Sequence, residues 1–149
     1  MHGPHLPLTP ALERQLADWL SEDLGRGDLT AAALAGASGR AHWVAKAGGV
    51  FCGGVLVEPL FRLLDPQLQV QRLVADGETI RAGQRLLELE GAAAALVAGE
   101  RTALNLAMRL SGIASATAAL AAALKGTGVR LADTRKTTPG LRVLEKYAV

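Results

Sequence analysis

The residues with the clearest chemical potential lie in the segment ADTRKTTPG, residues 132–140, which contains Thr134, Arg135 and Lys136. An arginine fork binds a carboxylate or phosphate through two parallel hydrogen bonds, a lysine adds a compact positive charge, and a threonine adds a hydroxyl. Residues 129–132 (VRLA), three of which are apolar, favour a short buried strand, and ligands of α/β folds bind where such strands end. The pattern indicates an anion-binding site, although a polar loop with solvated charges explains the same residues.

A second polar cluster interrupts a long Ala/Leu-rich segment at Glu100, Arg101, Thr102, Asn105 and Arg109. Glu and Arg are good helix formers and commonly occupy an exposed helix face, so a solvated surface accounts for them. The rest of this helix is almost entirely apolar. We therefore also consider that the cluster faces a specific partner or ligand.

The other chemically reactive residue types give no comparable indication of a functional site. His2 and His5 lie in the N-terminal tail, and His42 is alone on an expected strand, so no metal site is predicted. The single cysteine, Cys52, lies in an apolar run and is expected to be an inert core thiol. Residues 25–28 contain two glycines but follow no strand, so they do not form a dinucleotide-binding fingerprint. No catalytic residue is identified.

The bulk composition excludes several classes of protein. Half of the 149 residues are hydrophobic and 20% are charged, which is typical of a globular chain. A net charge of +2 gives no support for nucleic-acid binding. No secretory signal is visible, and the longest nearly uncharged stretch, residues 111–124, is shorter than the ~20 residues of a membrane span. We expect a soluble cytoplasmic protein without membrane or nucleic-acid partners.

The expected elements change in character along the chain. Up to residue 90 they mix helices with short strands, which is typical of an α+β domain. Residues 25–30 (GRGDLT) are expected as a loop, and Gly112 is expected to divide two Ala-rich helices. The expected helices are 10–24, 57–64, 92–110, 114–124 and 141–148, and the expected strands are 40–46, 50–52, 68–74, 78–80, 85–90 and 129–132.

Residues 100–115 (ERTALNLAMRLSGIAS) and 126–149 (GTGVRLADTRKTTPGLRVLEKYAV) resemble quinolinate phosphoribosyltransferase, also called nicotinate-nucleotide pyrophosphorylase (carboxylating). EDLGRGDLT at 22–30, FRLLD at 61–65 and DGETIRAGQ at 76–84 agree with it, so the resemblance covers nearly the whole chain in order. It implies an α+β N-terminal sandwich domain, residues 1–112, followed by the first βα unit of an incomplete α/β barrel, residues 113–149.

The resemblance also implies an activity and a set of contacts. The family transfers the phosphoribosyl group of phosphoribosyl pyrophosphate to quinolinate with decarboxylation and Mg²⁺, giving nicotinate mononucleotide for NAD biosynthesis. Arg135 matches an arginine that holds a quinolinate carboxylate, and Thr134 and Lys136 match its neighbours. Arg101 matches an arginine that reaches into the site of the partner subunit in a homodimer.

The family's later His-Arg pair, lysine and metal-organising carboxylates have no counterpart in these 149 residues, so we expect the chain alone to be inactive. Two alternatives stay open: the molybdenum-transport-associated homologue of the same family, and a non-catalytic dimerisation fragment. A lipoyl or biotinyl carrier would need a hairpin lysine, and no lysine occurs between Lys46 and Lys125.

Overall fold

The structure, a computed structural model, describes residues 5–149. Along the chain the elements are the helices α1 (Pro10–Leu24) and α2 (Leu29–Ala33), the strands β1 (Ser38–Val44) and β2 (Gly49–Val50), the 3-10 helix η1 (Gly54–Leu56), α3 (Val57–Arg62), β3 (Gln69–Arg72), β4 (Thr79–Ile80), β5 (Arg85–Ala92), α4 (Ala93–Ala123) and α5 (Arg142–Tyr147).

Two small antiparallel sheets form the β part of the molecule. The larger has the strand order β1-β5-β3, and the smaller pairs β2 with β4. In the larger sheet Trp43 faces Leu87 in register, and Leu87 is fully buried. His42 and Glu88 also face one another, on the solvent side of the sheet. Successive side chains thus point alternately to the core and to solvent, as expected for an antiparallel sheet that is covered on one face.

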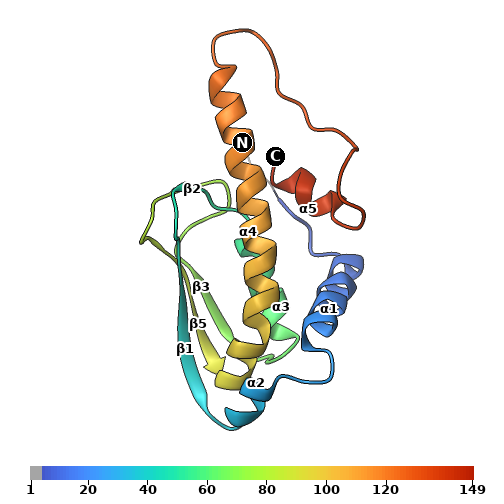
Figure 1. Cartoon of the computed structure of the whole chain (residues 1–149), viewed down its shortest axis with the longest axis vertical. Helices are drawn as coiled ribbons and strands as arrows, with labels where there is room; N and C mark the ends of the chain where they lie inside the picture. The colour runs from blue at the N-terminus through green and yellow to red at the C-terminus, as the bar shows by residue number, and fades with distance from the viewer. Residues whose placement is uncertain (1–4) are drawn as a thin grey trace.

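Helices cover the apolar face of the sheet, and α4 is central among them. In Figure 1 it runs along the length of the molecule, with the sheet on one side and α1 on the other. Gly99 allows the close approach of α3, because a Cβ at this position would lie 2.6 Å from a ring carbon of Phe61. Leu110, near the middle of α4, is almost completely buried. The N-terminal half of α4 is therefore the core helix of the domain.

The first helix forms as the sequence predicts. The Thr9 hydroxyl accepts a hydrogen bond from the Leu12 backbone N–H at 3.2 Å, and Pro10 occupies the first helical position. Gly25 ends the helix with a positive φ of 49°. The α+β character of the N-terminal domain is confirmed, with β1, β3 and β5 close to their predicted positions.

Three predictions about local structure were wrong. Residues 25–30 are only partly a loop, because the Asp28 carboxylate accepts from the Ala31 N–H at 2.9 Å and caps the short helix α2. Gly112 does not divide two helices: α4 is continuous for 31 residues, since alanine-rich flanks sustain a helix through one glycine. Residues 129–132 form no strand, and Val129 is 60% exposed.

The missing strand has a physical cause. A parallel strand requires neighbours along its edges and cover on both faces, and neither is present around residues 129–132. The first βα unit of a barrel is therefore not formed as predicted: these residues run as an extended connection to α5. The proposed boundary at residue 112 falls inside α4, and it stays a prediction.

One helix, α4, is long and apolar enough to cross a membrane by length and composition, with a mean hydropathy of 1.4 over its most apolar window. The core helix of a soluble protein meets the same criterion, and α4 packs against β1, β5 and α3. Its composition is therefore weak grounds for a membrane location.

Candidate anion-binding site

The predicted site residues Thr134, Arg135 and Lys136 lie in the connection between α4 and α5, residues 124–141, which we call the cationic loop. All three are exposed, and the Lys136 backbone N–H donates to the Thr134 hydroxyl at 3.1 Å. That bond closes a local turn of the type that Ser and Thr favour. Among residues 5–149, neither the Arg135 guanidinium nor the Lys136 ammonium has an ion-pair partner.

Charged side chains of α5 hold the cationic loop on both sides of these two cations. Asp133 forms an ion pair with Lys146. Arg142 donates from Nε to the Thr137 hydroxyl at 3.2 Å and from Nη2 to the backbone carbonyl of Arg135 at 3.3 Å. The backbone that carries Arg135 and Lys136 is thus tied to a helix, while their side chains stay free.

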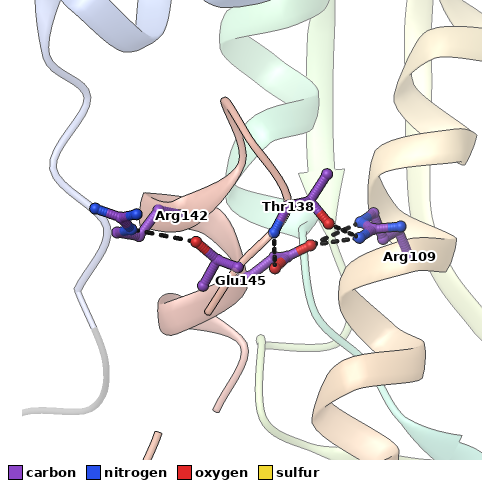
Figure 2. A network of polar contacts seen from close by, with 5 residues as sticks. Arg109, Thr138, Arg142 and Glu145 are labelled. Carbon is purple, nitrogen blue, oxygen red and sulfur yellow. Dashed lines mark hydrogen bonds and ion pairs between the residues drawn. The ribbon is translucent and has the colours of Figure 1, made fainter. Parts of the chain in front are cut away.

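Arg109 connects the cationic loop to the core helix, as Figure 2 shows. Its Nε donates to Glu145 Oε1 at 3.1 Å, and its Nη2 donates to the Thr138 hydroxyl at 2.6 Å. The second Glu145 oxygen accepts from the Thr138 backbone N–H at 3.0 Å. The hydrogen bond from Arg109, followed by those from Thr138, lowers the pKa of Glu145 to about 2. The carboxylate is therefore charged throughout the neutral range.

Arg101 lies elsewhere on α4 and does not join the cationic loop within this chain. Its Nη1 donates to Asp23 Oδ1 at 2.8 Å, and 63% of the arginine side chain is exposed. The hydrogen bond and charge of Asp23 raise the pKa of Arg101. The other oxygen of Asp23 and the hydroxyl of Thr102 are buried and have no partner among the described residues.

The cysteine and histidines that the sequence did not assign to a site lie outside the candidate site where the structure describes them. Burial, followed by the charge of Asp76, raises the pKa of Cys52 to about 12, which confirms an unreactive core thiol. His42 lies on the exposed face of β1, and residues 5–149 contain no group of three potential metal-ligating His, Cys, Asp or Glu side chains. His2 lies outside the described residues.

Sequence reasoning missed the groups that hold the site. Glu145 and Arg142 were assigned only to a C-terminal helix, and Asp23 only to the end of the first one. Their spacing did carry a signal, because Arg142, Glu145 and Lys146 share the short helix that follows the polar segment. Which residue each of them contacts depends on tertiary packing, and this is not visible in the pattern.

Together the fold and the candidate site define a class of protein: an α+β domain whose core helix leads into an exposed loop with two cations that are unpaired among the described residues. Comparison with known families then identifies the family. Residues 28–111 match the model of the quinolinate phosphoribosyl transferase N-terminal domain, and residues 113–149 match that of its C-terminal domain. The chain belongs to the quinolinate phosphoribosyl transferase family.

Individual relatives agree. The chain is 44% identical over 144 residues to a probable nicotinate-nucleotide pyrophosphorylase (carboxylating) of Synechocystis, covering 96% of this chain and 49% of that protein. It is 45% identical to the protein of the same name from Bacillus subtilis, covering 93% and 48%. The nicotinate-nucleotide pyrophosphorylase structure from Francisella tularensis superposes with a TM-score of 0.88 at 30% identity, covering 99% and 54%. The chain thus spans about half the length of these relatives.

Proposed function

We propose that the whole protein transfers the phosphoribosyl group of phosphoribosyl pyrophosphate to quinolinate and releases carbon dioxide and pyrophosphate, giving nicotinate mononucleotide for NAD biosynthesis. The observation that carries this proposal is the pair of free cations, Arg135 and Lys136, in a loop that matches the family's C-terminal model. Quinolinate is a dianion with adjacent carboxylates, so cations held at fixed positions suit it.

The proposed roles follow from the chemistry of each group. Arg135 binds one carboxylate with its planar fork, Lys136 places a compact charge beside the substrate or the phosphates, and Thr134 adds a hydroxyl. The ribosyl transition state resembles an oxocarbenium ion, and the departing pyrophosphate gains negative charge that cations stabilise. These groups bind and orient the substrate, and no residue is assigned as an acid or base.

The proposed homodimer gives Arg101 a function. Among residues 5–149, Arg101 forms its ion pair with Asp23 and no hydrogen bond or ion pair with Thr134, Arg135 or Lys136. An exposed arginine on the core helix fits a role in which it completes the site of the partner subunit. This arrangement would place one cation from each subunit on one dicarboxylate.

Mg²⁺ is proposed to enter with phosphoribosyl pyrophosphate. The described residues do not by themselves form a site for the ion, because Asp133, the carboxylate in the cationic loop, is paired with Lys146. We therefore assign no metal ligand in this chain. The protein is proposed to act in the cytoplasm, because a single free cysteine, Cys52, fits a reducing compartment.

Quinolinate binding to the whole protein, measured by calorimetry, tests the proposed site. Replacing Arg135 or Lys136 with alanine should weaken binding by roughly 10- to 100-fold, since a charge-assisted hydrogen bond contributes about 1.5–3 kcal/mol. Arg40→Ala removes an arginine that is also exposed but lies on the sheet, and should leave binding unchanged. Nicotinate, with one carboxylate, should bind more weakly than quinolinate. A wild-type protein that binds neither compound contradicts the proposal.

Subunit mixing tests the position of Arg101. If Arg101 acts in the partner's site, Arg101→Ala and Lys136→Ala proteins each have little activity at a quinolinate concentration well below their KM, but their mixed dimer contains one intact site. Equal mixing with subunit exchange should restore about a quarter of the wild-type activity. Mixed protein that stays inactive shows that Arg101 does not act across the dimer.

A further inference from the structure

The cationic loop has little structure of its own. No helix or strand forms between Ala123 and Arg142, and Thr134, Arg135 and Lys136 are exposed. Ordering each backbone residue costs about 1–2 kcal/mol of conformational entropy. A loop without a packed interior therefore keeps one conformation only where specific contacts hold it.

Among residues 5–149, the long-range side-chain contacts of the loop's polar residues converge on a few groups. Thr138 is the best-held position, because its hydroxyl accepts from Arg109 and its backbone N–H donates to Glu145. The two holding residues contact one another as well, since Arg109 also donates to Glu145. These three residues form a closed set in which each touches the other two (Figure 2).

Both holding residues stand on well-packed elements. Arg109 precedes Leu110, which is 1% exposed on α4, and Glu145 follows Leu144, which is 1% exposed on α5. The side chain of Glu145 is itself only 13% exposed. The contact with Thr138 therefore transmits the position of the core helix to a loop residue two positions after Lys136.

The charges of this region are divided into two groups. Arg109 and Lys146 are neutralised by Glu145 and Asp133 within the chain. Arg135 and Lys136 have no such partner among the described residues. A cation that is already paired contributes little to anion binding, so Arg109 and Lys146 fit a holding role, while Arg135 and Lys136 remain available to a ligand.

We propose that Arg109, Glu145 and Thr138 form a latch that positions Arg135 and Lys136 for a dicarboxylate ligand, which makes Arg109 and Glu145 positioning residues of the site. The proposal rests on the proposed function for its ligand. Groups that are already held in position bind a ligand more tightly, because less conformational entropy of the loop is lost on binding. Opening the latch should therefore weaken binding without removing a ligand contact.

The first test needs no ligand. Amide hydrogen exchange of Thr138, followed by NMR, reports the bond from its N–H to Glu145. Glu145→Gln and Arg109→Ala should accelerate this exchange and increase the fast motion of residues 133–138. The matched control is Arg40→Ala, which breaks an exposed Arg–Glu pair of similar length, 3.0 Å, on the sheet. Unchanged exchange in both latch variants overturns the latch.

The second test measures quinolinate binding to the whole protein. Glu145→Gln, Arg109→Ala and Thr138→Val should each weaken quinolinate binding by about 10-fold, because the loop must then be ordered when the ligand binds, with Arg40→Ala at the wild-type value. Thr138→Ser retains the hydroxyl and should restore binding, as should the exchanged pair Arg109→Glu with Glu145→Arg in part. In steady-state assays the loss should appear in the KM for quinolinate more than in kcat.

The outcomes separate the two proposals. If the wild-type protein does not bind quinolinate, the proposed function fails, while the exchange data still decide whether the latch orders the loop. If the wild-type binds and all three latch variants bind equally well, the latch proposal is wrong. If a variant loses binding because it unfolds, its circular dichroism changes too, and the milder Thr138→Val and Thr138→Ser pair then decides the question.

Discussion

Arginine serves several purposes in this protein, and its surroundings determine which. Arg109 meets a carboxylate and a hydroxyl of the same chain, so its planar fork holds structure together. Arg135 is tied only through its backbone carbonyl, which leaves its guanidinium for a ligand. Arg101 is intermediate, because it is paired with Asp23 and yet largely exposed. A dicarboxylate that recruits Arg101 must share the guanidinium with Asp23 or displace that carboxylate.

The pH response of Glu145 should reveal the latch directly. Its pKa is lowered to about 2 from an ordinary value of 4.5, chiefly by the hydrogen bond from Arg109 and then by Thr138. Because the folded-state pKa is the lower one, the stabilising contribution is fully present above about pH 4.5 and is lost as the pH falls toward 2. A carbon-13 NMR titration of the carboxyl measures this value.

Arg109→Ala should return the Glu145 pKa toward 4.5, whereas Arg40→Ala should leave it near 2. A wild-type Glu145 that titrates at its ordinary value would show that the ion pair with Arg109 does not persist in solution.

Residue types indicate which side chains can bind an anion. They do not indicate which of these side chains already form an ion pair with an acidic residue of the same chain. The pattern left Arg135 and Lys136 open between a solvated loop and a binding site, and the resemblance to the family assigned them to quinolinate; the structure gives neither an ion-pair partner among residues 5–149. Asp23 lies 78 positions from Arg101 and Glu145 lies 36 positions from Arg109. Pairing across such separations is decided by how helices pack, and helical periodicity carries no information about it.

At the scale of elements, α4 shows how local preference and packing combine. Its alanines sustain a helix through Gly99 and Gly112, each of which costs about 1 kcal/mol relative to alanine. This cost is the reason why the sequence predicted a helix break at Gly112, and the helix in fact continues through that residue. The two glycines differ in what surrounds them, which the sequence cannot show: Gly99 faces Phe61, and Gly112 has open space.

Replacing each glycine with alanine should give opposite results. Gly112→Ala meets nothing within 4 Å, so it should stabilise the protein by about 0.5–1 kcal/mol through helix propensity. Gly99→Ala places its Cβ 2.6 Å from a Phe61 ring carbon and 3.1 Å from Leu64. Overpacking costs about 1–3 kcal/mol, which exceeds the propensity gain, so this variant should be destabilised.

Urea denaturation of the two single variants measures both free energies of unfolding. The comparison is internally matched, because the same substitution is made twice in one helix. If Gly99→Ala is as stable as Gly112→Ala, then α3 does not pack against α4 as closely as described.

The strand predicted at residues 129–132 did not form, because a strand depends on neighbours that local sequence does not supply. Its residues have the apolar character of a buried parallel strand, yet they are exposed and unpaired within the described chain. A β-strand depends on partners as much as on its own composition. Local pattern was sufficient for α1, which Thr9, Pro10 and Gly25 delimit, because helix capping is satisfied within a few residues.

For the molecule as a whole, the attachment of the C-terminal segment to the N-terminal domain is the main long-range feature. Leu144 and Ala148 are buried in the common core. Beside them the Tyr147 hydroxyl donates to Asp76 Oδ2 at 2.9 Å, across 71 positions of sequence. Burial, together with this bond, raises the pKa of Tyr147. The sequence identified Asp76 only as a turn residue, so this connection had no visible signal.

Asp76 joins three parts of the chain, because its carboxylate also accepts from the backbone N–H groups of Gly53 at 3.0 Å and Gly54 at 2.8 Å. Tyr147→Phe removes one of these bonds and should cost about 1.5–3 kcal/mol, as expected for a hydrogen bond to a charged group. Asp76→Ala also leaves two buried N–H groups without an acceptor, so it should cost several kcal/mol, at about 1–3 for each group.

A double-mutant cycle in urea denaturation separates this contact from general destabilisation. In the Asp76→Ala background Tyr147→Phe should cost almost nothing, which gives a coupling of about 1 kcal/mol or more. Asp65 provides the matched control, because its carboxylate likewise accepts from two backbone N–H groups, those of Gln67 at 2.9 Å and Ala92 at 3.0 Å, without contacting Tyr147. Asp65→Ala and Tyr147→Phe should therefore be additive. Additivity in both cycles would mean that the contact between Tyr147 and Asp76 does not help to hold the C-terminal segment.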